Sequence, residues 1–121
     1  MKKLTADLMG MSLNYAVAIV EGYNVHVDSN GDYIVQGYRP YPTNLKQYYP
    51  SGDWERGGPI IERERIRLDP RESEWQASYW DDEVENFRTS YGPTALIAAM
   101  RCYVHSKLGN AVDIPEEMGT K

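Results

Sequence analysis

The chain has 121 residues, of which 41% are hydrophobic and 26% are charged, and its formal net charge is −5. This length and composition indicate one globular domain and argue against a disordered chain. The acidic excess lies in the second half, because residues 1–68 carry eight basic and eight acidic side chains whereas residues 69–121 carry five and ten. This balance disfavours nonspecific binding to nucleic acid, since an acidic protein repels phosphate backbones at long range.

The cysteine count and the N-terminal segment both bear on the compartment. Cys102 is the only cysteine, so no intramolecular disulfide forms and a reducing cytoplasm is favoured. Lys2 and Lys3 are not followed by a long apolar stretch, because polar residues and glycine interrupt it. Neither a signal peptide nor a membrane span is therefore predicted, and no association with a membrane is expected.

The first part of the chain is predicted to form a helix, a hairpin and a loop. Residues 10–21 carry two adjacent apolar stripes at helical spacing, which predicts a helix buried on more than one side and ended by Gly22. Residues 23–38 switch to period two, with Ser29-Asn30-Gly31 as the turn of a hairpin. Residues 39–52 contain three prolines and are predicted to form a long irregular loop, of a length that is usually functional or disordered.

Two short helices are predicted to follow this loop. Asp53 is suited to cap one helical turn, which Gly57 ends. Pro59 is suited to the first position of a second short helix, because the N–H that it lacks would be unpaired there anyway. Ile60 and Ile61 of this second helix are expected to face the core.

The second part of the chain predicts a further hairpin and a long helix. Residues 66–69 and 74–80 read as strands joined around Pro70, and residues 93–108 read as a helix ended by Gly109. The predicted inward face of this helix consists of Leu96, Ile97, Met100, Val104 and Leu108.

This order of elements predicts an α+β fold. Two amphipathic helices and an antiparallel sheet of about four strands are expected to form a two-layer sandwich, with both main helices on one face of the sheet. Residues 1–110 are expected to form a single domain, and residues 111–121 a flexible C-terminal tail.

Two acidic segments resemble parts of metal sites. Residues 28–32 place oxygen side chains as the start of an EF-hand loop does, but Tyr33 and Arg39 occupy the positions where that loop needs glycine and glutamate. We interpret this segment as a hairpin turn. The acidic residues 81–85 are interpreted as a solvated loop, since no glycine-rich phosphate-binding motif accompanies them. No metal site and no cofactor is predicted.

Two further groups of residues have a chemical and a structural interpretation. Cys102 and His105 lie three apart on the last helix, but nothing in the sequence supplies the access or the orienting group that a nucleophilic cysteine needs. No catalytic residue is predicted, and an enzyme is disfavoured. Thr89, Ser90 and Gly92 precede the same helix, where they are suited either to bind an anion or to cap the helix.

The segment from Tyr38 to Trp54 is the main candidate site. It interleaves tyrosines with Arg39 and Lys46 and contains no acidic residue before Asp53. Such a surface is suited to anchor a protein partner or to stack unpaired bases. The structural alternative is that its tyrosines and prolines fold the connection over the edge of the sheet.

Two runs of the sequence carry a family resemblance. Residues 53–62 read Asp-Trp-Glu-Arg-Gly-Gly-Pro-Ile-Ile-Glu, and residues 91–101 read Tyr-Gly-Pro-Thr-Ala-Leu-Ile-Ala-Ala-Met-Arg. Together with Thr5-Ala6-Asp7-Leu8, Leu13-Asn14-Tyr15 and Glu21-Gly22-Tyr23, they resemble the signatures of the NinX-like proteins of tailed bacteriophages and prophages. The resemblance covers residues 5–109 and implies a phage-borne accessory protein that acts inside the bacterial host.

The sequence favours a non-catalytic protein-interaction module in the bacterial cytoplasm, with a phage or host protein as its partner. The alternative is a single-stranded nucleic-acid binder that uses the Tyr/Arg-rich loop 38–54, which the net charge disfavours. Tyr38, Arg39 and Trp54 are the predicted contact residues. Gly57, Gly58 and Pro59 are expected to set the backbone shape, and Glu62 to orient a polar partner.

Overall fold

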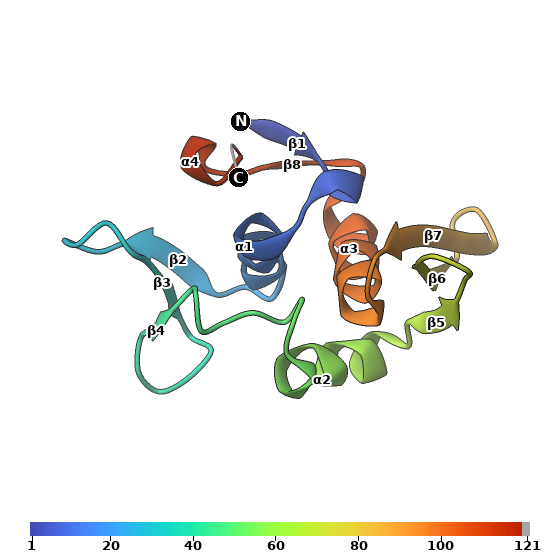
Figure 1. The fold of residues 1–121 in the computed structure, drawn as a ribbon, viewed down its shortest axis with the longest axis horizontal. Coiled ribbons are helices and arrows are strands. Elements are labelled where there is room, and N and C mark those ends of the chain that lie inside the picture. The colour runs from blue at the N-terminus through green and yellow to red at the C-terminus, as the bar shows by residue number, and fades with distance from the viewer. Residues whose placement is uncertain (120–121) are drawn as a thin grey trace.

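The computed structural model describes residues 1–119, which form four α-helices, one 3-10 helix and eight strands (Figure 1). The helices are α1 (Gly10–Val20), α2 (Trp54–Glu64), α3 (Ala95–Leu108) and α4 (Glu116–Gly119), and the 3-10 helix is η1 (Thr5–Asp7). The strands are β1 (Lys2–Leu4), β2 (Asn24–Val27), β3 (Tyr33–Gln36), β4 (Thr43–Asn44), β5 (Arg67–Pro70), β6 (Trp75–Asp81), β7 (Asn86–Gly92) and β8 (Ala111–Asp113).

The strands form three separate antiparallel sheets, with the orders β1-β8, β2-β3-β4 and β5-β6-β7. Figure 1 shows the second sheet beside α1 and the third beside α3, while α1 and α3 pack together between them. The mixed α+β class is confirmed, but the strands do not form the predicted single sheet of about four strands. The physical reason is that α1 is apolar on more than one side, so it packs on α3 and on β2 at the same time.

The first hairpin forms as predicted. Strands β2 and β3 pair with Val25 opposite Val35, and Gly31 in the turn has a φ of 83°. The loop that follows contributes the short strand β4, whose Thr43 pairs with Val35 on the other edge of β3. Part of the predicted irregular loop is therefore tied to this sheet.

Strand β7 follows the predicted acidic loop 81–85, and it includes residues that were predicted only to bind an anion or to cap the last helix. It pairs with β6 along its whole length, from Trp75 opposite Gly92 to Asp81 opposite Asn86. Most of its side chains are exposed, so β7 lacks the apolar alternation that reveals a half-buried strand.

Helix α2 is continuous, whereas two short helices were predicted. The Asp53 carboxylate accepts a hydrogen bond from the Glu55 N–H at 3.0 Å, so the predicted cap is present. Gly57 continues the helix, and Pro59 lies inside it rather than at its start. The helix ends at Glu64, and the next residue, Arg65, caps it with a left-handed backbone at a φ of 54°.

Helix α3 and the C-terminal segment complete the core. The Thr94 hydroxyl caps α3 by accepting from the Ile97 N–H at 3.1 Å. Met100 and Val104 are fully buried as predicted, but Leu108 is 41% exposed and does not face the core. Residues 111–119, for which a flexible tail was predicted, contain β8 and α4, and residues 120–121 lie outside the described residues.

The segment after α3 contributes apolar side chains to the core. Strand β8 pairs with β1, with Lys3 opposite Val112, so the two ends of the domain lie side by side. The buried side chains of this segment are Val112, Ile114 and Met118.

Candidate functional site

The inner side of the connection between β3 and α2 is anchored in the core. Tyr48 is 2% exposed, and its ring makes edge contacts with the rings of Tyr38 at 4.8 Å and Tyr23 at 5.8 Å between centroids. Burial also raises the pKa of the Tyr48 hydroxyl well above its ordinary value. Tyr48 is therefore a core residue and cannot be a contact residue for a partner.

A buried asparagine holds the end of the same connection. The Asn14 side-chain carbonyl on α1 accepts from the Ser51 N–H at 3.1 Å and from the Ser51 hydroxyl at 2.7 Å. Both residues are buried, so these bonds replace contacts that water would otherwise make. They fix the chain just before α2 begins.

Two arginines lie against the tyrosine rings of this connection. The Arg39 guanidinium lies 5.0 Å from the centroid of the Tyr38 ring. The Arg56 guanidinium lies between two rings, 5.7 Å from Tyr38 and 5.8 Å from Tyr49. These distances are those of cation–π contacts, which hold both the cation and the ring in place.

The charge of Arg56 is neutralised by a neighbouring carboxylate. Its Nη1 forms an ion pair with the Asp53 carboxylate, and its Nε is buried without a hydrogen-bond partner within the described residues. Its guanidinium is thus shielded, and Arg56 supports the surface rather than reaching out from it.

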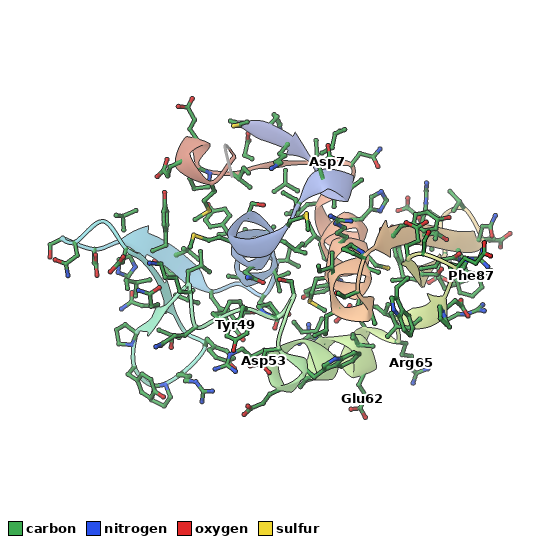
Figure 2. All side chains as sticks on the ribbon, in the orientation of Figure 1. Asp7, Tyr49, Asp53, Glu62, Arg65 and Phe87 are labelled. Atoms are coloured by element: carbon green, nitrogen blue, oxygen red, sulfur yellow. The ribbon has the colours of Figure 1, made fainter. Side chains whose placement is uncertain are left out.

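The outer side of the connection exposes large aromatic side chains. Trp54, the first residue of α2, is 56% exposed, Tyr41 is 60% exposed and Tyr49 is 43% exposed. We refer to Tyr38, Arg39, Tyr41, Tyr49, Trp54 and Arg56 together as the aromatic–arginine surface. Figure 2 shows Tyr49 and Asp53 where the connection meets α2.

The predicted glycine–proline run has a packing role at its first position. A Cβ built on Gly57 would lie 2.4 Å from the Pro50 carbonyl oxygen and 2.6 Å from Leu96 Cδ2. Gly58 has more room, since its nearest neighbour would be the Trp54 ring at 3.8 Å. Gly57 therefore allows α2 to approach α3 and the connection closely, as only a residue without a side chain can.

Pro59 and Glu62 lie on the exposed side of α2. Within the described residues, the Glu62 side chain makes no hydrogen bond or ion pair, and Figure 2 shows it pointing away from the body of the protein. The structure thus places Tyr38 between Arg39 and Arg56 of α2, with Trp54 at the start of this helix and Glu62 further along it.

The sequence did not single out three members of this surface. Arg56 had a signal, because it lies three residues after Asp53 on a helix and so on the same face. No signal in the sequence separated Tyr41 and Tyr49 from Tyr48, because residues in an irregular loop have no periodic pattern from which their burial can be predicted.

The residues considered for chemistry have structural surroundings. Cys102 is fully buried, and this burial raises the pKa of its thiol to about 12. The ring of His105 bonds Tyr79 through Nδ1 and Asn110 through Nε2, at 3.2 and 2.8 Å. A thiolate–imidazole pair is therefore not formed.

The acidic segments are engaged in turns. Asp28 accepts from the backbone N–H groups of Asn30 and Asp32, as a hairpin turn requires. Asp81 is paired with Arg88, which holds the pKa of the Asp81 carboxyl below its usual value. Within residues 1–119, no three histidine, cysteine or acidic side chains gather closely enough to hold a metal ion.

The described residues define a small α+β protein that exposes an aromatic surface beside one of its helices. The model of the bacteriophage P22 NinX family matches residues 4–107, and the chain belongs to this family. The match confirms the resemblance carried by the two sequence runs, and it supports a phage-encoded accessory protein. Among curated proteins, none matches the chain. The described part of the chain contains no helix of the length and apolarity that crossing a membrane requires.

Proposed function

We propose that this chain is a non-catalytic protein-interaction module that binds a phage or host protein in the bacterial cytoplasm through the aromatic–arginine surface. The observation that carries the proposal is that Tyr41 and Tyr49 of the connection and Trp54 at the start of α2 are exposed, while the inner side of the connection is buried and Arg39 lies against Tyr38. Tryptophan, tyrosine and arginine are the residues that contribute most binding energy at protein interfaces.

The support beneath this surface favours binding. Tyr48 and the Asn14–Ser51 hydrogen bonds order the connection before any partner arrives. Ordering an interface on binding costs about 0.5–1.5 kcal/mol for each immobilised side chain, so a surface that is already ordered avoids part of this cost. Arg39 forms no ion pair within the described residues, which suits a partner that presents a carboxylate beside apolar side chains.

The charges of the surface argue against the alternative of single-stranded nucleic acid. Arg39 and Lys46 are the basic side chains available, because Arg56 is paired with Asp53 and Glu55 lies 4.0 Å from the same nitrogen. For a single strand, each phosphate contact contributes about −0.7 to the slope of log binding constant against log salt concentration. Two such contacts release few counterions, so their electrostatic contribution is too small to support strong binding. The exposed rings of Tyr41, Tyr49 and Trp54 remain available to stack bases.

Affinity capture tests the proposal. The tagged chain, its Trp54→Ala variant and its Arg39→Ala/Trp54→Ala variant are used to capture proteins from bacteria carrying the phage. We expect the variants to lose at least about tenfold in partner recovery, as for a central interface residue. Trp80→Ala is the matched control, because Trp80 is 51% exposed but lies on β6.

Circular dichroism and thermal melting show whether each variant is folded. Unchanged recovery by the folded double variant would contradict the proposal. A complex with single-stranded DNA at low salt, lost on adding salt and absent in the double variant, would favour the alternative instead.

A further inference from the structure

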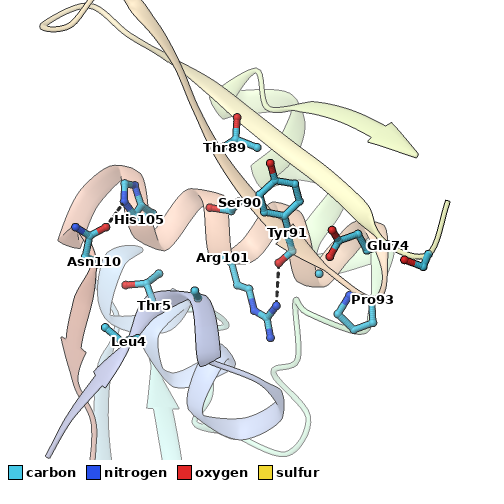
Figure 3. A pocket seen from close by; sticks show the side chains of 13 residues that line it. Leu4, Thr5, Glu74, Thr89, Ser90, Tyr91, Pro93, Arg101, His105 and Asn110 are labelled. Atoms are coloured by element: carbon cyan, nitrogen blue, oxygen red, sulfur yellow. Dashed lines mark hydrogen bonds between the residues drawn. The ribbon is translucent and has the colours of Figure 1, made fainter. Parts of the chain in front are cut away.

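A pocket of about 730 Å³ lies away from the aromatic–arginine surface, between the free edge of β7 and the η1 segment (Figure 3). Its lining includes Ser90 and Arg101, with Asn110 on the opposite side and Glu74 at the end near Pro93. A pocket of this volume is within the range of small-molecule sites.

Arg101 is the central feature of the pocket. It is 9% exposed, and its guanidinium donates to two backbone carbonyls, from Nε to Leu8 at 2.9 Å and from Nη1 to Tyr91 at 2.8 Å. The third nitrogen, Nη2, has no hydrogen-bond partner within the described residues, and it is not among the sealed, unpaired atoms. Nη2 is therefore not fully sealed from solvent, and Arg101 lines the pocket.

The charge of Arg101 is not neutralised by an ion pair. The ion pairs among residues 1–119 involve other cations, and Asp7, the acid that acts on Arg101 electrostatically, lies beyond ion-pair distance. Burial lowers the pKa of Arg101, as expected for a cation removed from water. A buried cation without a counter-charge is costly, and a bound anion would remove part of that cost.

Neutral hydrogen-bond donors lie in the same pocket. The Ser90 hydroxyl has no hydrogen-bond partner within the described residues. The Asn110 side-chain oxygen accepts from His105 Nε2 at 2.8 Å, which leaves the Asn110 amide nitrogen to donate elsewhere. Arg101, Ser90 and Asn110 thus offer donors, and Glu74 is the single acidic residue of the lining.

We propose that this pocket binds the oxyanion of a small organic acid, a phosphate monoester or a carboxylate, through the Arg101 guanidinium and the Ser90 hydroxyl. A guanidinium is the cation best suited to such oxyanions, since its charge-assisted hydrogen bonds are directional. The site uses Ser90 of β7 and Arg101 of α3, and it does not use the N-terminus of α3, which Thr94 caps.

The site is tested with inorganic phosphate, phenyl phosphate and benzoate as probes, at low ionic strength and against matched sodium chloride. Two-dimensional NMR of the folded chain follows the amides of residues 89–92, Asn110 and the Arg101 Nε–H. We expect saturable shifts confined to these groups at probe concentrations up to about 10 mM, a range suited to weak sites. A stronger response to phenyl phosphate than to benzoate assigns a phosphate ligand, and the reverse assigns a carboxylate.

Variants separate binding from folding. Ser90→Ala is expected to weaken binding about threefold, because it removes a hydrogen-bond donor. Glu74→Gln is expected to strengthen binding about threefold, because it removes a negative charge that repels the anion. Arg101→Met is expected to abolish binding. If Arg101→Met does not fold, the opposite effects of Ser90→Ala and Glu74→Gln still decide whether the site binds an oxyanion.

Trp54→Ala is the matched control and leaves the probe affinity unchanged, so a failed partner capture does not bear on this site. Shifts that do not saturate, shifts centred on Arg39, or equal affinities for Ser90→Ala, Glu74→Gln and the unaltered chain would each overturn the proposal.

Discussion

Gly57 of α2 lies directly against Leu96 of α3, with 2.6 Å between the position of a Gly57 Cβ and Leu96 Cδ2. Gly57 belongs to the family run at residues 53–62 and Leu96 to the run at residues 91–101, so the two runs meet in space. Gly92, at the start of the second run, has a similar constraint, because its Cβ would lie 2.6 Å from the Ala98 nitrogen. These glycines therefore serve packing, whereas Trp54 of the first run faces solvent.

Alanine substitutions at the two neighbouring glycines of α2, Gly57 and Gly58, are expected to change the stability of the protein in opposite directions. Gly57→Ala places a methyl group against a backbone carbonyl that cannot move aside, and overpacking of this kind costs about 1–3 kcal/mol. Gly58→Ala meets no close atom, and it is expected to raise the free energy of unfolding by about 0.5–1 kcal/mol because alanine lowers the conformational entropy of the unfolded chain. Urea unfolding of both variants measures the difference, and equal stabilities would contradict the close approach of α2 and α3.

Removal of Asn14 and removal of the Ser51 hydroxyl are expected to lower the stability by unequal amounts. Asn14→Ala leaves the buried Ser51 N–H without a partner, which costs about 1–3 kcal/mol in addition to the lost packing. Ser51→Ala removes only the hydroxyl bond and should cost less. Chemical denaturation gives both values. A larger loss for Ser51→Ala would show that Asn14 does not hold this part of the connection.

The thiol of Cys102 is expected to be inert in the folded protein. With a pKa of about 12, only about one thiol in ten thousand is ionised near pH 8, and the sulfur is also fully buried. Labelling by a thiol reagent should therefore proceed at the rate of unfolding and become rapid in denaturant. Fast, stoichiometric labelling of the native chain would reopen a catalytic role for Cys102.

Stability is expected to fall at alkaline pH. Burial raises the pKa of the Cys102 thiol from 9.0 to about 12, and burial and the Glu21 hydrogen bond raise the pKa of Tyr103 above 10.0. The folded state thus holds these protons more tightly than the unfolded chain does. The Cys102 contribution to stability is complete below about pH 9 and declines from there to about pH 12, and the Tyr103 contribution declines above about pH 10. Each group loses up to about 1.4 kcal/mol per pH unit within its window.

Unfolding free energies measured at a series of pH values check this expectation, with tyrosine absorbance reporting ionisation. Tyr103→Phe and Cys102→Ala each remove one of the two groups and should give a shallower decline with pH. A decline of equal slope in both variants and the unaltered chain would assign the alkaline loss to other groups.

The elements that were predicted well are those whose signals are local. The period of residues 10–21 and the Ser29-Asn30-Gly31 turn specify α1 and the first hairpin, because helix periodicity and turn geometry depend on neighbours in sequence. The cap at Asp53 was predicted for the same reason. Strand β7 was not predicted, because its mostly exposed side chains do not alternate between apolar and polar.

By itself, the sequence determined the α+β class, the family, and an aromatic, arginine-containing connection before α2. Only the tertiary structure decided that the strands divide into three sheets around α1 and α3, and that Tyr48 enters the core while Tyr49 faces solvent. It also placed Arg101 in a pocket with Ser90 and Asn110. The physical reason is that burial and charge neutralisation depend on which distant segments pack together, and no local pattern of residues carries that information.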